Sequence, residues 1–330
     1  MLICPNHRYF VALSVFILTL QTNAQPVVDI HSQNANYNEL DLNRTPKLAS
    51  VNETLTQRFP DAIIIGVKKC GTRALLEFLK INPLVKAPGP EVHFFDKNFD
   101  KGLDWYRNQM PFTVKNQLTI EKSPAYFVSR QVPQRVHQLN PHMKLLLVVR
   151  NPIVRAISDY TQSVTRKKRS IQPTNTFEEM SRCNQTHLNS TRSKWFQKRF
   201  SVDGINSSWG AVKIGVYHRF LQQWLHYFPI SQFLFIDGER LIKSPADEIR
   251  RAERFLGLQP VVTSKDFVTD PIKGFPCVRR VDSKVPHCLG KTKGRAHPKV
   301  DKKLIHKLQD FYRPENEKFF RLINQYFHWY

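Results

Sequence analysis

The chain has 330 residues, a hydrophobic content of 41% and a formal net charge of +23 at pH 7. The length fits one large domain or two small ones, and the apolar content is ample for a folded core, which excludes a largely disordered chain. The positive charge points to a polyanionic partner, namely nucleic acid, an anionic membrane or an acidic polysaccharide.

Residues 1–24 have the pattern of a signal peptide. Arg8 precedes an apolar run over 10–20, and Ala24 supplies a small residue at a cleavage-like position. The run is shorter than the about 20 residues that a bilayer span needs, so a short signal-anchor is the alternative. Either interpretation sends the rest of the chain into the secretory pathway.

Asn-x-Ser/Thr sequons agree with a lumenal location. They begin at Asn43, Asn52, Asn184, Asn189 and Asn206. In that compartment we expect no nucleic-acid partner, and a sulfated or carboxylated glycan becomes the expected polyanion. Residues 25–58 are polar and rich in Asn, which predicts a stem or linker before a folded domain over 59–330.

A phosphate-binding strand, loop and helix are predicted over residues 62–79. A β-branched run leads into a loop that contains Gly66 and Gly71, and apolar residues at helical spacing follow. Backbone N–H groups at such a helix start bind anions. Full positive charges come from Lys68, Lys69 and Arg73. The loop is not a Walker A motif, because its lysines precede Gly71; an ordinary turn on a basic protein is the alternative.

Glu91 and His93 form a second candidate site. A carboxylate and an imidazole two residues apart, followed by Phe94 and Phe95, fit a general base with a supporting partner. The alternative is a surface glutamate beside two core aromatic residues.

Alternating strands and helices predict an α/β fold, with one central parallel sheet flanked by helices. Strands are expected over 62–65, 118–127, 144–149 and 233–237, and helices over 132–139, from 152 onward, over 209–228 and over 246–256. Lys122 lies where one strand ends, at the edge where α/β sites gather. Arg150 ends another strand and, with Ser158, fits a second phosphate; a simple strand cap is the alternative.

The last third of the chain is predicted to contain a hairpin, followed by a basic loop of the kind that covers a bound nucleotide. Cys277 and Cys288 enclose a short segment, so we pair them as a disulfide. A basic glycine loop over 290–298 follows, and helices are expected over 298–312 and 314–326. The basic segment 166–208 is either a polyanion track or a solvated charge run. Cys70 is expected to be a small filler rather than a nucleophile, and no metal-ligand spacing is present.

Together these segments resemble the heparan sulfate glucosamine 3-O-sulfotransferases, within the lumenal sulfotransferases. The likeness extends from about Phe59 to the end of the chain. It is carried by residues 63–76, 91–96, 121–127, 150–152 with 158–160, and 293–298. All of these motifs in order are far more specific than any one of them.

The resemblance implies a donor, 3′-phosphoadenosine 5′-phosphosulfate, and an acceptor, the 3-hydroxyl of glucosamine in heparan sulfate. For the 5′ side of the donor it implies Lys69, Cys70, Gly71, Thr72 and Arg73. For the 3′-phosphate it implies Arg150 and Ser158. For the loop that closes over the donor it implies Lys293, Gly294, Arg295, Ala296 and His297.

The resemblance also assigns the chemistry. Glu91 matches the catalytic base, Lys69 stabilises the leaving phosphate, and Lys122 belongs to the catalytic group. The implied acceptor-binding residues are Glu91, His93, Asp96, Lys122, Gln162, Trp209 and Gly210. No metal is expected to be required, because basic residues supply the positive charge.

Two positions depart from the family pattern. Cys70 stands where glycine is usual, and Pro276 stands where an aromatic residue usually precedes the first hairpin cysteine. Phe275 is the candidate to supply that aromatic contact.

The implied protein is a monomeric enzyme of the Golgi lumen, either anchored or secreted. Two alternatives belong to other classes: a secreted heparin-binding protein without catalysis, and a lumenal P-loop kinase that uses ATP and Mg²⁺.

Overall fold

The structure is a computed structural model that describes residues 54–167, 175–182, 201–202, 204–280, 283–290 and 294–329. Several predictions lie outside these residues: the signal peptide, the stem up to residue 53, Cys183, Lys293 and the sequons at Asn43, Asn52, Asn184 and Asn189. The fold below is that of the compact unit Asn43–Tyr330. Among the described residues, no helix combines the length and the apolar character of a bilayer span.

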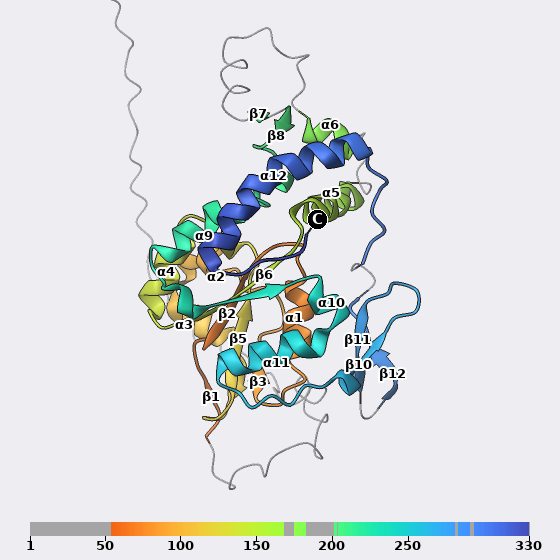
Figure 1. The fold of residues 1–330 in the computed structure, drawn as a ribbon. Coiled ribbons are helices and arrows are strands. Elements are labelled where there is room, and N and C mark those ends of the chain that lie inside the picture. Colours follow the sequence, from red (N-terminus) through yellow and green to blue (C-terminus); the bar gives the residue numbers. More distant parts are fainter. Residues whose placement is uncertain are drawn as a thin grey trace, which may run out of the picture. The chain divides into compact units, whose positions relative to one another are not determined.

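A five-stranded parallel sheet forms the centre of the fold (Figure 1). Its order is β3 (Val85–Lys86), β5 (Leu118–Lys122), β2 (Ala62–Gly66), β6 (Lys144–Val149) and β9 (Phe233–Asp237). The apolar residues of β2 and β6 are fully buried, as expected of strands covered on both faces. The predicted α/β fold with a parallel sheet is confirmed.

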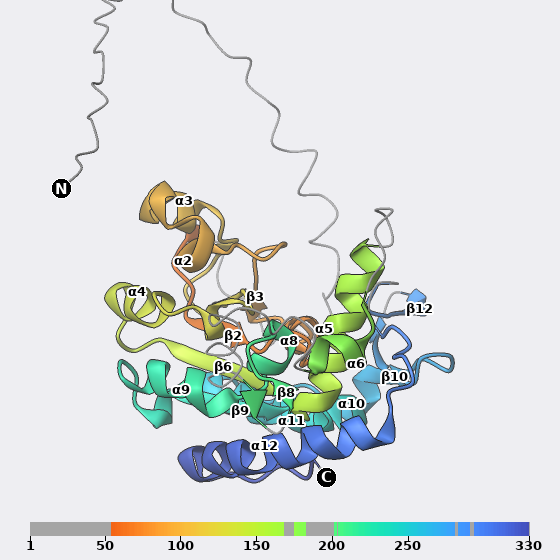
Figure 2. The same cartoon turned by 90° about the horizontal axis from the view of Figure 1, so that it is seen from above.

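Helices cover both faces of this sheet. Figure 1 shows α1 (Thr72–Leu79) and α11 (Pro245–Leu256) below it, and α9 (Tyr217–Leu225) and α12 (Lys302–Ile323) above it. Helix α5 (Pro152–Lys167) lies beside α8 (Gly210–Lys213), as Figure 2 shows. A second apolar core lies where α5, α8 and α12 meet.

Short elements complete the described part. The helices are α2 (Phe94–Lys97), α3 (Gly102–Asn108), α4 (Val132–Leu139), α6 (Phe177–Ser181) and α10 (Arg240–Lys243). The strand pairs are β1 (Thr56–Gln57) with β4 (Phe112–Thr113), and β7 (Ser201–Val202) with β8 (Ile205–Asn206). The 3₁₀ turns are η2 (Phe99–Lys101), η3 (Tyr126–Val128), η5 (Ile230–Gln232) and η6 (Ser264–Asp266).

The C-terminal helix differs from the prediction. The two helices expected on either side of Pro314 are one continuous helix, α12, with the proline inside it. An internal proline costs about 3 kcal/mol. The buried face continues past it, from Leu308 and Tyr312 to Phe319 and Phe320, and burying each such side chain contributes about 1.5–3 kcal/mol. The buried stripe therefore outweighs the break.

The helix expected over 209–228 is divided. It forms α8 and α9, with Gly215 between them. A Cβ at Gly215 would lie 2.8 Å from both Pro152 Cβ and the Tyr312 hydroxyl oxygen. The chain therefore bends where it passes close to α5 and α12.

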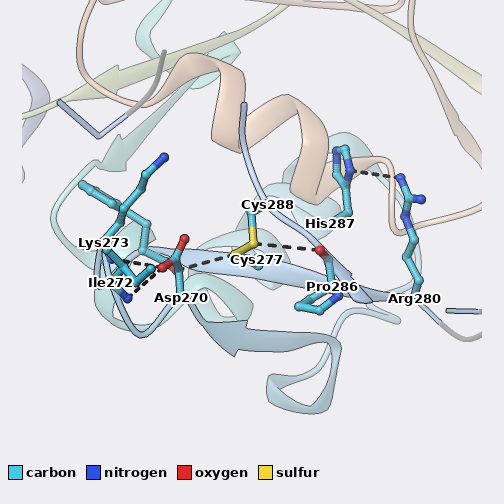
Figure 3. The surroundings of a disulfide bond; sticks show 9 residues. Asp270, Ile272, Lys273, Cys277, Arg280, Pro286, His287 and Cys288 are labelled. Atoms are coloured by element: carbon cyan, nitrogen blue, oxygen red, sulfur yellow. Dashed lines mark hydrogen bonds between the residues drawn. A yellow bond between two sulfur atoms is a disulfide. The ribbon is translucent and has the colours of Figure 1, made fainter. Parts of the chain in front are cut away.

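A small antiparallel sheet lies outside the central one. It contains β10 (Phe267–Thr269), β11 (Pro276–Arg280) and β12 (Ser283–His287). The predicted disulfide between Cys277 and Cys288 is present, and Figure 3 shows Asp270 and Lys273 next to it. The strand β10 was not predicted. Asp270 lies close to both cysteines, but the three residues do not form a metal site, because both cysteine sulfurs are in the disulfide.

Candidate active site

A cavity of about 860 Å³ opens where the central strands end. Its walls come from the loop after β2, the segment after β5, Arg150 after β6, Gly238 after β9, and the small antiparallel sheet. Ligands of parallel α/β folds bind at this edge because the connecting loops gather there. The cavity is large enough for a nucleotide-sized ligand.

The predicted phosphate loop forms one wall of the cavity, and all of residues 68–73 line it. Lys69 and Gly71 both have positive φ angles, of 76° and 111°. Gly71 caps the start of α1 in this conformation, and its carbonyl accepts from Leu75 N–H at 3.0 Å. Such turns aim successive N–H groups at one point, which favours an anion.

The cations of the loop are held in place by carboxylates. Lys68 Nζ lies 2.7 Å from Asp159 on α5, and Arg73 pairs with Glu77 at 2.7 Å. The buried Arg155 also donates to Asp159, at 3.2 Å, so the carboxylate joins the loop to the helix. Burial raises the pKa of Asp159, but Arg155 and Lys68 outweigh that effect and the pKa is lowered. Asp159 is therefore ionised under neutral conditions.

Gly238 fits tightly against the phosphate loop. A Cβ at this position would lie 2.5 Å from the carbonyl oxygen of Cys70 and 3.0 Å from that of Val149. We expect Gly238→Ala to lower the free energy of unfolding by about 1–3 kcal/mol, the usual cost of overpacking, and to weaken nucleotide binding. Denaturant unfolding and titration calorimetry measure the two effects. Gly89, where a Cβ meets nothing within 4 Å, is the matched control.

Arg150 and Ser158 both reach the cavity. Arg150 follows β6, and Asn151 Oδ1 accepts from Ile153 N–H at 2.9 Å at the start of α5. Val154, Ser158 and Gln162 line the cavity from one face of α5, since residues four apart on a helix lie above one another. Arg150 and Ser158 thus line one cavity at this strand end, and their binding of a second phosphate stays a prediction.

Glu91 lies at the cavity wall between a lysine and a histidine. Lys122 Nζ is 2.5 Å from Glu91 Oε1, and His93 Nε2 is 3.2 Å from Oε2. His93 Nδ1 lies 3.0 Å from Asp96 Oδ2, so the imidazole is held at both nitrogens. Burial raises the pKa of Glu91, but the hydrogen bond and charge of Lys122, with a smaller effect of His93, lower it overall. The carboxylate is therefore ionised and able to accept a proton.

Most of the predicted site residues meet in the cavity. Lining it are Lys69, Cys70, Gly71, Thr72, Arg73, Glu91, His93, Arg150, Ser158, Gln162, Gly294, Arg295 and His297. Lys122 and Asp96 join the site through Glu91 and His93.

Three other predicted residues do not line the cavity. Ala296, Trp209 and Gly210 are not among the residues that line the cavity. The Trp209 ring packs against Tyr160 and Phe177, with centroids 6.4 Å and 5.4 Å apart. Its position is fixed by Asn206, whose Oδ1 accepts from Trp209 N–H at 3.2 Å. The donor-binding role of Ala296 and the acceptor-binding roles of Trp209 and Gly210 stay predictions.

Sequence reasoning missed other parts of the site. The cavity lining includes Lys97, Asp270 and Lys273, which were not assigned to the site. Glu239, which was not assigned either, pairs with Arg150. Glu239 follows β9 as Arg150 follows β6, so the same strand-end rule had the means to identify it. Phe275 lines the cavity as suggested, and a Cβ on Gly294 would lie 2.8 Å from its ring. Lys97 and Lys273 sit on segments without any strand-end pattern.

Cys70 is a buried filler in this wall, as expected. Its side chain is buried, and its Sγ lies 3.7 Å from the Tyr217 hydroxyl. Burial raises the pKa of the thiol to about 12. We expect iodoacetamide at pH 8 to leave Cys70 unmodified in the native protein and to label it after denaturation, because the thiolate is the reactive form. Peptide mass spectrometry reads both states, and rapid native labelling would contradict the assignment.

The comparisons with known proteins agree with this architecture. A sulfotransferase domain model matches residues 59–321. A crystal structure of a sulfotransferase from Alicyclobacillus acidocaldarius superposes with a TM-score of 0.56, at 20% identity, over 82% of this chain and 99% of that chain. The fold and the domain match define a sulfotransferase.

The relatives narrow the class further. Mouse heparan sulfate glucosamine 3-O-sulfotransferase 6 is 46% identical over 287 residues, which cover 87% of this chain and 78% of that protein. Mouse heparan sulfate glucosamine 3-O-sulfotransferase 3B1 is 46% identical over 275 residues, and human 3A1 is 47% identical over 283 residues. The chain belongs to the heparan sulfate glucosamine 3-O-sulfotransferase family. It spans 66% of the length of the mouse 3B1 protein and 65% of the human 3A1 protein.

Proposed function

We propose that this protein transfers a sulfuryl group from 3′-phosphoadenosine 5′-phosphosulfate to the 3-hydroxyl of glucosamine in heparan sulfate. One observation carries the proposal: Glu91, held ionised by Lys122, shares a cavity wall with a cationic phosphate loop and Arg150. A base for the acceptor and two anion sites for the donor are the parts that sulfuryl transfer needs. The names of the relatives support the choice of substrate.

The donor fits the cavity by charge and size. The loop of residues 69–73 is the site for its 5′ phosphosulfate, and Arg150 with Ser158 is the site for its 3′-phosphate. Gly294, Arg295 and His297 line the same cavity and cover the nucleotide, with Lys293 beside them in sequence. Burial lowers the pKa of His297, and the positive charges of Arg150 and Lys69 lower that pKa further.

The reaction is an in-line displacement at sulfur. The acceptor oxygen forms a bond to sulfur as its proton passes to Glu91, and the bond from sulfur to the phosphate oxygen breaks. Negative charge then grows on the leaving phosphate, where Lys69 and the loop N–H groups stabilise it. Alignment of the two substrates supplies much of the remaining acceleration.

Basic side chains supply all the positive charge in this scheme, so we propose that no metal is required. Transfer is expected to be unchanged in an excess of the chelator EDTA, which removes a bound divalent ion. The kinase alternative predicts a different result. A P-loop kinase would transfer phosphate from ATP, and the chelator would abolish that transfer because the reaction needs Mg²⁺. Loss of transfer in the chelator would argue for a bound ion.

The acceptor defines the partner and the compartment. Heparan sulfate carries sulfates and carboxylates, so a strongly basic surface increases its rate of encounter in a salt-dependent way. We propose a monomeric enzyme of the secretory pathway that acts in the Golgi lumen and has no nucleic-acid partner. Secretion or anchoring depends on how residues 1–24 are processed.

Disaccharide analysis tests the proposal. Heparan sulfate is incubated with the enzyme and the sulfate donor, digested, and analysed for 3-O-sulfated glucosamine. We expect new 3-O-sulfated products that depend on the donor. Binding to heparin without any such product would favour the heparin-binding alternative, and sulfate at another position would reject the 3-hydroxyl as acceptor.

A further inference from the structure

Arg150 forms an ion pair with Glu239, a carboxylate that is not among the residues lining the cavity. Its Nε donates to Glu239 Oε1 at 3.2 Å, and the N–H of Asn151 donates to the same oxygen at 3.3 Å. Glu239 follows β9, the strand that pairs with β6, so the contact joins two neighbouring strand ends. Gly238 precedes Glu239, and a Cβ at this glycine would lie 3.0 Å from the Val149 carbonyl oxygen and 3.5 Å from Arg150 Cβ.

The backbone of Arg150 is fixed separately. The Tyr217 hydroxyl donates to the Arg150 carbonyl at 2.7 Å, and Gly238 N–H donates to the Val149 carbonyl at 2.8 Å. Glu239 is in turn fixed at its own backbone, where its N–H donates to Asp237 Oδ1 at 2.8 Å. A change at Glu239 therefore removes the contacts to the guanidinium and to the Asn151 N–H, while the carbonyls of Val149 and Arg150 keep their own partners.

The point of contact on the guanidinium is informative. An arginine grips phosphate with a planar fork, and a partner at Nε fixes the orientation of that plane. Glu239 contacts Nε, so this contact does not involve the terminal nitrogens of Arg150, a residue that lines the cavity. The side chain of Arg150 is 19% exposed and that of Glu239 is 30% exposed, so the pair is partly shielded from water.

We propose that Glu239 is a positioning residue for the 3′-phosphate of the donor, which acts by orienting the guanidinium of Arg150. This role rests on the proposed function, because it assumes a nucleotide with a 3′-phosphate. Without the carboxylate the guanidinium samples several orientations, and binding must restrict it at an entropic cost. The effect is confined to ligands that carry the 3′-phosphate.

The test compares two nucleotides on the same variants. Calorimetry measures the Kd of adenosine 3′,5′-bisphosphate and of adenosine 5′-phosphate. We expect Glu239→Ala to raise the Kd of the bisphosphate about tenfold. The Kd of the monophosphate should stay within about twofold, because that nucleotide has no 3′-phosphate for Arg150 to bind. Glu239→Asp keeps the charge but shortens the reach, and we expect the same selective loss.

Glutamine separates orientation from charge. The amide oxygen of Glu239→Gln still accepts from Arg150 Nε, and the amide nitrogen takes the place of Oε2, which is buried and has no hydrogen-bond partner among the described residues. We expect this variant to bind the bisphosphate within about threefold of the wild type. Glu248→Ala is the matched control, because Glu248 is a buried carboxylate that pairs with Arg240 and Arg251 outside the cavity lining.

The outcomes are distinct. Equal losses for both nucleotides in Glu239→Ala, or no loss in either, would overturn the positioning role, and so would a glutamine variant as weak as the alanine one. If the wild type itself has no preference for the bisphosphate, the proposed donor is rejected, and this role for Glu239 is rejected with it. A wild-type preference with an unaffected alanine variant rejects the role of Glu239 alone.

Discussion

Replacing Glu91 with glutamine is expected to lower kcat by about 10²–10⁴-fold, the usual contribution of a general base. The amide keeps the size of the side chain and can still accept from Lys122, whose Nζ lies 2.5 Å from Glu91 Oε1. It cannot take the proton of the acceptor hydroxyl. Transfer of labelled sulfate measures the loss, and calorimetry with adenosine 3′,5′-bisphosphate should give an unchanged Kd.

Glu315→Gln serves as the control for that variant. Glu315 on α12 also contacts a histidine and a lysine, His218 and Lys318, but none of the three lines the cavity, so the change should leave kcat nearly unchanged. Normal transfer by Glu91→Gln would show that another group is the base. Because the pKa of Glu91 is lowered below its ordinary 4.5, kcat/KM should show no loss due to this group between about pH 8 and 6.

Replacing Lys69 with alanine is expected to lower kcat by about 10²–10³-fold, the range seen when one donor to a developing negative charge is removed. Lys69 lines the cavity within the phosphate loop at φ 76°. Alanine has the same Cβ, so the backbone strain of this position is unchanged and the fold should tolerate the variant. Single-turnover transfer separates the chemical step from donor binding.

Lys80→Ala is the matched control, since Lys80 lies past the end of α1 and does not line the cavity. A Lys69→Ala enzyme with a higher donor KM but an unchanged kcat would show that the lysine binds the donor equally in the ground state and the transition state. In that case another cation of the loop, such as Arg73, stabilises the leaving phosphate.

The sheet and the phosphate loop were predictable because their signals are local. A buried β-branched run predicts a strand, glycines predict a loop, and apolar residues at helical spacing predict a helix. Each of these patterns lies within a few consecutive residues. Helix α4 and strand β9 lie where they were predicted. Of the two residues predicted from strand ends, Arg150 lines the cavity and Lys122 contacts the lining residue Glu91.

Other features depend on contacts that are distant in sequence. The passage of α12 through Pro314 is decided by the apolar face it packs against, and the break at Gly215 by the nearness of Pro152 and Tyr312. The contact between Glu239 and Arg150 joins residues 89 apart. A single sequence carries no signal of which carboxylate meets which arginine across a sheet. The packing of Trp209 on Tyr160 and Phe177 likewise joins residues that are distant in sequence, and Trp209 is not among the residues that line the cavity.

A crystal structure of the enzyme with adenosine 3′,5′-bisphosphate and a heparan sulfate oligosaccharide is the most direct test of the proposed mechanism. We expect one carboxylate oxygen of Glu91 within about 3 Å of a glucosamine 3-hydroxyl, with the 5′-phosphate at Lys69 and the 3′-phosphate at Arg150. A complex in which the sugar hydroxyl nearest the 5′-phosphate contacts another base, or in which the nucleotide lies outside this cavity, would contradict it.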